Sequence, residues 1–168
     1  MSIGLFFLRS VIGLVMAGHG AQKLLGWFGG YGLDATGKFM TQIGFHPGKS
    51  FAAIAAGSEI LSGLLVAFGF LGPIGPALMI SVMIVAAVTV HWGQGLFAPK
   101  GIEVPLLYAA AALGVALTGY GEFSLDAALG ISARWTTELT WIVLAAGMVG
   151  GVANLALRRR PATTTVSA

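Results

Sequence analysis

Ionisable side chains inside long apolar segments are the first feature of this sequence that could support chemistry. Arg9, His19, Lys23, Glu59 and His91 lie within such segments or at their ends. A charged residue at the centre of a bilayer costs about 2.5–3.5 kcal/mol on insertion scales, so it usually faces the interior of a helical bundle and marks a proton, ion or ligand pathway. At ~100° per residue, Arg9, His19 and Lys23 share one helix face. We therefore take these five residues as candidate functional residues.

Glu59 is among the most deeply placed charges. With a rise of ~1.5 Å per residue it lies ~12–13 Å from the start of its apolar segment, and Ser58 and Ser62 flank it. Arg9 is the deeply placed cation, so we expect Arg9 and Glu59 to pair directly or through a water. Two interpretations stay open. The pair fixes the helix register, or burial makes Glu59 titratable near neutral pH, so that it transfers protons or orients a ligand.

The two histidines predict a shallow cavity. The topology described below places His19 and His91 at the same membrane level. The cavity would be lined by His19, Lys23, His91, Trp92, Gln94 and Tyr108. The ammonium group of Lys23 could instead simply reach the interface. Histidines on separate helices could also ligate haem or a metal, but no Glu-x-x-His partner or third ligand accompanies them, so we predict no metal site.

Composition indicates the elements that position these residues. Hydrophobic residues make up 57% of the 168 residues, charged residues 9%, and the mean hydropathy is +0.89. Each of five apolar segments approaches the ~20 residues that a helix needs to cross a bilayer. They are residues 3–22, 51–70, 73–92, 103–120 and 137–157. The sequence therefore predicts an all-α transmembrane bundle in a lipid bilayer.

Turn and charge patterns predict the topology. The Gly and Pro residues in 69–73 leave room for only a tight turn, so the second and third segments form an antiparallel hairpin. With five spans, one side of the membrane carries Lys23, Lys38, Lys49, Lys100 and Arg158–Arg160, and the other carries only Arg134. Basic residues concentrate on the cytoplasmic side, so we expect the N-terminus outside and the C-terminus in the cytoplasm.

Residues 26–50 differ from the spans. The run 26–32 is rich in Gly and aromatic residues, and an amphipathic stretch around Phe39 and Met40 follows. A phosphate-binding loop would need a preceding strand and a Gly-Lys-Ser/Thr ending, both of which are missing. The pattern instead predicts an aromatic belt and an interfacial helix.

Composition also excludes several functions. The chain has no cysteine, so it has no dithiol relay, thiolate metal ligand or iron–sulfur ligation, and a redox role would need a bound or borrowed cofactor. The net charge is +3, much of it from Arg158–Arg160, which indicates a helix-flanking cluster and no nucleic-acid surface. No basic residue precedes the first segment and no small-x-small site follows it, so we interpret it as a retained helix.

Taken together, these residues resemble the DoxX family of small bacterial membrane proteins. The resemblance spans about residues 3–130. Its motifs are Arg9-x-x-x-Gly13, Gly18-His19-Gly20-x-x-Lys23, Gly26-Trp27-Phe28-Gly29-Gly30, Gly57-x-Glu59, His91-Trp92, Gly101-x-Glu103-x-Pro105-Leu106-Leu107-Tyr108 and Phe123-Ser124-Leu125-Asp126. The family usually has four helices. The resemblance therefore implies a four-helix domain over residues 1–130, with an additional transmembrane helix and a basic cytoplasmic tail over 131–168.

The resemblance also implies a function. Some relatives form the membrane subunit of thiosulfate:quinone oxidoreductases, and others associate with membrane redox and oxidative-stress complexes. It implies a subunit of a redox system in the bacterial cytoplasmic (inner) membrane, possible use of a quinone, and a partner subunit or homo-oligomer. By position, Arg9, Glu59 and His91 would be catalytic. Quinone binding would fall to His19, Lys23, Trp92 and Tyr108, with Trp27 and Phe28 also flanking the ring.

Two alternatives come from other functional classes. In the first, the protein is a noncatalytic anchor or assembly subunit, and the small-residue face of Gly147 and Gly151 binds a larger protein or a second copy. In the second, it is a small-molecule or proton carrier. The titratable Glu59 and the repeated His-x-x-Gln pattern at residues 19–22 and 91–94 motivate that hypothesis.

Overall fold

The structure is a computed structural model, and it describes residues 2–97 and 99–159. All its regular elements in those ranges are helical, which confirms the predicted all-α class. The α-helices are α1 (Ser2–Leu25), α2 (Gly32–Gln42), α3 (Gly48–Phe68), α4 (Ile74–Ala86), α5 (Glu103–Thr118), α6 (Leu125–Ala128) and α7 (Thr137–Ala156). A π-helical turn, Ala87–His91, extends α4, and short 3₁₀ turns occupy Trp27–Gly29 and Ser132–Arg134.

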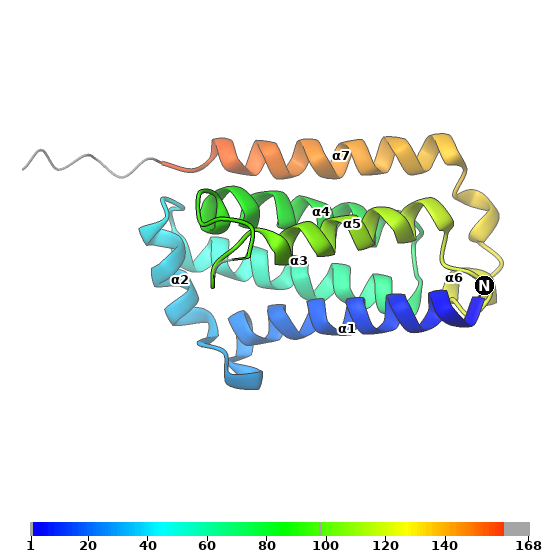
Figure 1. The fold of residues 1–168 in the computed structure, drawn as a ribbon, viewed down its shortest axis with the longest axis horizontal. Coiled ribbons are helices and arrows are strands. Elements are labelled where there is room, and N and C mark those ends of the chain that lie inside the picture. The colour runs from blue at the N-terminus through cyan, green and yellow to red at the C-terminus, as the bar shows by residue number, and fades with distance from the viewer. Residues whose placement is uncertain (1, 98, 160–168) are drawn as a thin grey trace, which may run out of the picture.

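Helices α1, α3, α4, α5 and α7 lie side by side in one bundle (Figure 1). Within the described residues, four helical segments are long and apolar enough to cross a membrane: Ile3–Leu25, Gly48–Phe68, Ile74–His91 and Thr137–Ala156. Helix α5 is apolar but has only 16 residues, or ~24 Å, so it is shorter than the predicted segment 103–120. The chain is a multi-pass membrane protein, and α7 is the additional C-terminal helix beyond α1, α3, α4 and α5.

The bundle has two ends, which we name after the short helices beside them (Figure 1). At the α2 end, α1, α4 and α7 finish while α3 and α5 begin; at the α6 end, these directions are reversed. The α2 end therefore carries the loops or helix ends with Lys23, Lys38, Lys49, Lys100, Arg158 and Arg159, and the α6 end carries Arg134. The helix directions thus group the basic residues as the sequence predicts, while Arg160 lies outside the described residues.

Helices α1 and α3 pack with their backbones in close approach. A Cβ atom on Gly13 would overlap the backbone of Gly63 and Ala67, and one on Gly20 would overlap the backbone of Ala56. Small residues let helices approach where lipid removes the hydrophobic drive for association. This contact fixes the register between the helices that carry Lys23 and Glu59.

Helix α7 packs against α4 through the small-residue face noted in the sequence. A Cβ on Gly147 would meet the Ala77 carbonyl oxygen, and one on Gly151 would lie 2.8 Å from the Ser81 carbonyl oxygen. The hypothesis that this face binds another protein is therefore wrong, because α4 of the same chain occupies it.

The predicted hairpin is present, and the predicted amphipathic stretch forms a helix, α2. Helices α3 and α4 are neighbours joined by a turn at Gly69–Pro73, and α2 packs across α3 at the start of that helix (Figure 1). Thr36 of α2 donates a hydrogen bond to the carbonyl oxygen of Lys23 in α1 (3.3 Å). Helix α2 thus covers the end of the bundle at which α1 stops.

Candidate functional site

Lys23 and Glu59 form an ion pair between α1 and α3. The Lys23 ammonium group contacts Oε1 of Glu59, and the side chains are 35% and 3% exposed, respectively. The other carboxylate oxygen, Oε2, is buried and has no hydrogen-bond partner among residues 2–97 and 99–159. The pair therefore retains one acceptor atom that another molecule could use.

The expected ion pair between Arg9 and Glu59 is wrong, and the direction of the Cα–Cβ bonds explains why. In an α-helix these bonds tilt toward the N-terminus. On the antiparallel helices α1 and α3, Lys23 therefore leans toward the middle of the bundle while Glu59 leans toward the α2 end, so that they converge. The side chain of Arg9 leans toward the α6 end, away from Glu59.

Arg9 instead joins α1 to the end of α3. The residue is 1% exposed, and its guanidinium group donates hydrogen bonds to the carbonyl oxygens of Val66, Ala67 and Phe123. The first two belong to the last turn of α3, where a cation complements the helix dipole. The Phe6 ring centroid lies 5.2 Å from the guanidinium carbon. Arg9 therefore holds the α6 end together and makes no contact with Glu59.

A cavity of about 150 Å³ adjoins the Lys23–Glu59 pair. Its walls come mainly from α2, α3 and α4, with Asn154 from α7. The lining residues are Lys23, Thr36, Phe39, Met40, Phe51, Ile54, Ala55, Ser58, Glu59, Leu78, Ser81, Val82, Val85, Ala86, Thr89, Val90 and Asn154. Sequence reasoning missed Ser81, Thr89 and Asn154, because small polar residues on separate helices carry no signal until packing brings them together. The site is thus an apolar cavity with an ion pair on its wall.

His19 and Tyr108 form a separate contact. Their ring centroids are 5.9 Å apart in an edge-to-face arrangement. Nδ1 of His19 lies 3.2 Å from Oε1 of Gln22, whose amide nitrogen donates to the Phe28 carbonyl oxygen (3.1 Å). The polar atoms of this group tie the end of α1 to the aromatic loop that follows it.

The remaining predicted residues do not reach the Lys23–Glu59 cavity. Nδ1 of His91 lies 2.8 Å from the Lys100 carbonyl oxygen, which ties the end of α4 to the next loop. Trp92 is 73% exposed, and neither it nor His91 lines the cavity. Trp27 and Phe28 are also exposed, at 58% and 74%. The structure therefore brings His19 and Tyr108 together but does not gather all six residues of the predicted shallow cavity, and the two His-x-x-Gln segments make different contacts.

No metal centre emerges from the described part of the chain. Residues 2–97 and 99–159 contain no group of three or more His, Asp or Glu side chains placed to hold a metal ion. The two histidines that sequence reasoning weighed as ligands each contact a neighbour close in sequence, Gln22 and Lys100.

The fold and this site define a multi-pass helical membrane protein with a buried carboxylate beside an apolar cavity. A sequence model of the DoxX family matches residues 4–92, just over half of the chain, and the chain therefore belongs to that family. The match stops before α5, so the motifs quoted above for residues 101–126 lie beyond it. Every lining residue of the cavity except Asn154 lies within the match. No curated protein and no solved structure matches the chain.

Proposed function

We propose that this protein is the membrane subunit of a quinone-linked redox system, and that the Lys23–Glu59 cavity receives the quinone headgroup. The observation that carries the proposal is the free Oε2 atom of Glu59, buried without a partner among the described residues beside an ammonium donor. Buried polar atoms normally have a partner, so an orphaned carboxylate oxygen on a cavity wall indicates a ligand site.

The cavity suits a headgroup with a long apolar tail. At about 150 Å³ it is smaller than the ~300–1,000 Å³ of sites that enclose a whole drug-sized ligand, so it would hold a ring and leave the tail outside. Ile54 lines the cavity and is 57% exposed, so the cavity wall continues onto the outer surface of the bundle. An isoprenoid tail would leave along this surface into the lipid.

The two charged residues would have distinct roles. Reduction of a quinone to a quinol takes two electrons and two protons. The Lys23 ammonium group would donate a hydrogen bond to a carbonyl oxygen of the quinone. The Glu59 carboxylate would first take up a proton from water, and its Oε2 hydroxyl group would then donate to the headgroup and supply that proton. The second proton would come from water through the partly exposed Lys23. The electrons would come from a redox centre on a partner subunit, because the chain has no cysteine for an iron–sulfur cluster.

The other predicted residues receive supporting roles in this proposal. Arg9 would position α1 against α3, and the His19–Tyr108 contact would position the end of α1, which carries Lys23. His91 and Trp92 lie off the cavity and would act at a partner surface near the α2 end. We propose that this end faces the cytoplasm of a bacterial inner membrane, since it holds most of the basic residues.

Native mass spectrometry of the gently extracted protein tests the proposal. We expect a quinone-mass adduct on the wild type, and we expect Glu59→Gln and Lys23→Met each to bind one quinone fewer. The matched control is the exposed ion pair of Asp34 and Lys49, in which Lys49→Met should keep the adduct. A number of bound quinones that Glu59→Gln leaves unchanged, or a wild type without any adduct, would contradict the proposal.

A second candidate is the noncatalytic anchor or assembly subunit. The exposed aromatic side chains of Trp27, Phe28 and Tyr31 favour it, because they form an apolar surface at the α2 end that a partner could cover. In the same spectra, a stoichiometric protein partner without a quinone adduct would favour this function. A Glu59→Gln variant that keeps the partner but loses electron transfer would instead favour the redox subunit.

A further inference from the structure

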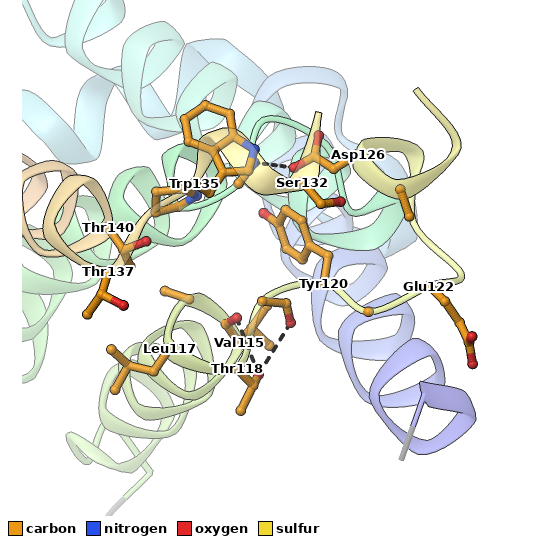
Figure 2. A pocket seen from close by; sticks show the side chains of 16 residues that line it. Val115, Leu117, Thr118, Tyr120, Glu122, Asp126, Ser132, Trp135, Thr137 and Thr140 are labelled. Atoms are coloured by element: carbon orange, nitrogen blue, oxygen red, sulfur yellow. Dashed lines mark hydrogen bonds between the residues drawn. The ribbon is translucent and has the colours of Figure 1, made fainter. Parts of the chain in front are cut away.

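A larger cavity of about 490 Å³ lies at the α6 end, away from the Lys23–Glu59 pair (Figure 2). It is bounded by the end of α5, the loop after it, the turn before α4 and the start of α7. The lining residues are Gly72, Pro73, Val115–Gly121, Glu122, Asp126, Ala127, Ser132, Trp135, Thr137 and Thr140. The two cavities share no lining residue and lie at opposite ends of the bundle.

Two buried polar atoms in the lining residues lack partners. The Tyr120 hydroxyl group and Nε1 of Trp135 have no hydrogen-bond partner in the part of the chain that the structure describes. Tyr120 is 6% exposed. Leaving such a group unsatisfied is unfavourable, so two of them at one cavity indicate a bound molecule. Figure 2 shows both side chains bordering the space that Thr137 and Thr140 close from another side.

Packing holds the two aromatic rings in place. The Trp135 ring lies directly against Gly72, where a Cβ atom would overlap it. The Tyr120 ring centroid lies 6.0 Å from the guanidinium carbon of Arg9, within cation–π range. The rings that carry the two unpartnered donors are therefore held in place at the cavity wall.

The chemistry of the lining selects the class of ligand. The Trp135 N–H group can only donate, and burial raises the pKa of Tyr120, so its hydroxyl group stays protonated and can donate as well. The described lining contains Glu122 and Asp126 but no Lys, Arg or His, which disfavours an anion. Both Asp126 oxygens already accept backbone N–H groups, from Leu71 and Gly72. The two buried groups without partners, on Tyr120 and Trp135, are thus hydrogen-bond donors, and they suit a neutral molecule with acceptor oxygens.

We propose that this cavity binds a neutral, carbonyl-bearing amphiphile from the bilayer, whose carbonyl oxygens accept hydrogen bonds from Tyr120 and Trp135. Val115, Ala116 and Leu117 supply apolar wall, and Leu117 is 50% exposed on the outside of α5. The site lies where α5 ends and α7 begins, the level at which the polar part of an amphiphile meets its tail. A quinone headgroup and a glycerolipid ester share this chemistry.

Fluorescence of Trp135 tests the proposal locally. Trp27, Trp92 and Trp141 are each at least half exposed and are replaced by Phe, which leaves Trp135 as the single fluorophore. Decyl-benzoquinone is added to the protein in detergent, and phosphatidylcholine brominated high on its acyl chains is used in nanodiscs. We expect saturable quenching by at least one probe. Saturation by the quinone identifies the ring as the ligand, and saturation only by the brominated lipid identifies the ester.

Variants decide whether the quenching reports the cavity. Tyr120→Phe keeps the ring but removes one donor, and should weaken the apparent affinity about 5–10-fold. Tyr31→Phe, at a position 87% exposed, is the matched control and should change nothing. Ala116→Leu should fill the cavity and abolish saturation, with its melting temperature recorded to confirm folding. Quenching that does not saturate, or that Tyr120→Phe leaves unchanged, would overturn the proposal.

The variant Glu59→Gln distinguishes ligand binding at this cavity from the quinone binding proposed at the Lys23–Glu59 cavity. We expect the variant to leave Trp135 quenching unchanged, because Glu59 belongs to the cavity at the other end. Loss of quenching in Glu59→Gln would show that the two ends are not independent and would overturn the assignment of the ligand to Tyr120 and Trp135.

Discussion

Lys23 and Glu59 form an ion pair in which only one partner reaches the surface of the bundle. Lys23 is 35% exposed, whereas Glu59 is 3% exposed and lines the cavity beside it. Removing the lysine therefore leaves an unpaired buried carboxylate, but removing the carboxylate leaves an ammonium group that can extend to the interface. The two single variants should differ in stability for this reason.

We predict that Lys23→Met destabilises the protein by roughly 3 kcal/mol and that Glu59→Gln costs clearly less. The double variant should recover much of the loss, because it leaves no buried charge. Thermal unfolding in detergent, compared across the two single variants and the double variant, checks this double-mutant cycle. Equal losses in the two single variants would contradict the asymmetry.

We predict that Arg9→Lys destabilises the bundle by about 2 kcal/mol, because an ammonium group cannot replace the planar fork that serves carbonyl groups on α3 and at Phe123. The quinone adduct proposed for the Lys23–Glu59 cavity should survive, since Arg9 makes no contact there. Unfolding temperature and native mass spectrometry measure the two effects. Loss of the adduct at unchanged stability would instead place Arg9 in the site.

The fold could be predicted from the sequence to a large extent, because membrane insertion is governed by length and apolarity. Runs of ~20 apolar residues predict the helices. The Gly/Pro turn and the distribution of Lys and Arg predict which helix ends lie together at each end of the bundle. The main departure is α5, which stops at Thr118. The backbone turns after it, with Gly119 at a φ of 72°.

The candidate site could be predicted only in part. The distance of Glu59 from the start of its apolar segment identified it as a deeply placed carboxylate, but the predicted partner, Arg9, was wrong. Counting residues locates Cα atoms and ignores the direction of the side chains. The predicted cavity failed for a related reason. His91 lies at the α2 end of the bundle, as His19 does, but its ring contacts the Lys100 carbonyl oxygen. Neither unpartnered donor at the α6 end stood out in the sequence, since a Tyr and a Trp there are also typical of a membrane interface.

We predict that Gly13→Ala strongly destabilises the bundle, whereas Gly18→Ala does not. A Cβ at Gly13 would overlap the backbone of α3, but one at Gly18 meets no atom within 4 Å. At Gly18 the higher helix propensity of Ala should add up to ~1 kcal/mol of stability. Unfolding temperatures of the two variants test the close approach of α1 to α3. Similar values for both would contradict it.

We predict that the Asp34 carboxyl group titrates below its usual pKa of about 3.9. The Lys49 ammonium group lies 2.7 Å from it and, through a hydrogen bond and its charge, lowers the pKa of Asp34. The charged form is therefore favoured in the folded protein. Its contribution to the contact between α2 and α3 is complete above the usual pKa and is lost as the pH falls through the lowered one. Because both side chains are largely exposed, added salt should weaken the effect.

Carboxyl chemical shifts followed by NMR across an acid titration check this prediction. Lys49→Met should raise the pKa of Asp34 toward its usual value of about 3.9, since the charge of Lys38 remains. The same pKa in the wild type and in Lys49→Met would contradict the pairing.

We predict that Asp126→Asn loosens the α6 end and costs about 1–3 kcal/mol. The carboxylate is 2% exposed, and its two oxygens accept from the N–H groups of Leu71 (2.8 Å) and Gly72 (2.7 Å). An amide offers only one oxygen, so one N–H group would face another donor. Because Gly72 supports the Trp135 ring, the change should also weaken saturable quenching of Trp135. Glu122→Gln, an exposed acid-to-amide change on the same cavity, is the control, and equal effects of the two variants would contradict the role of Asp126.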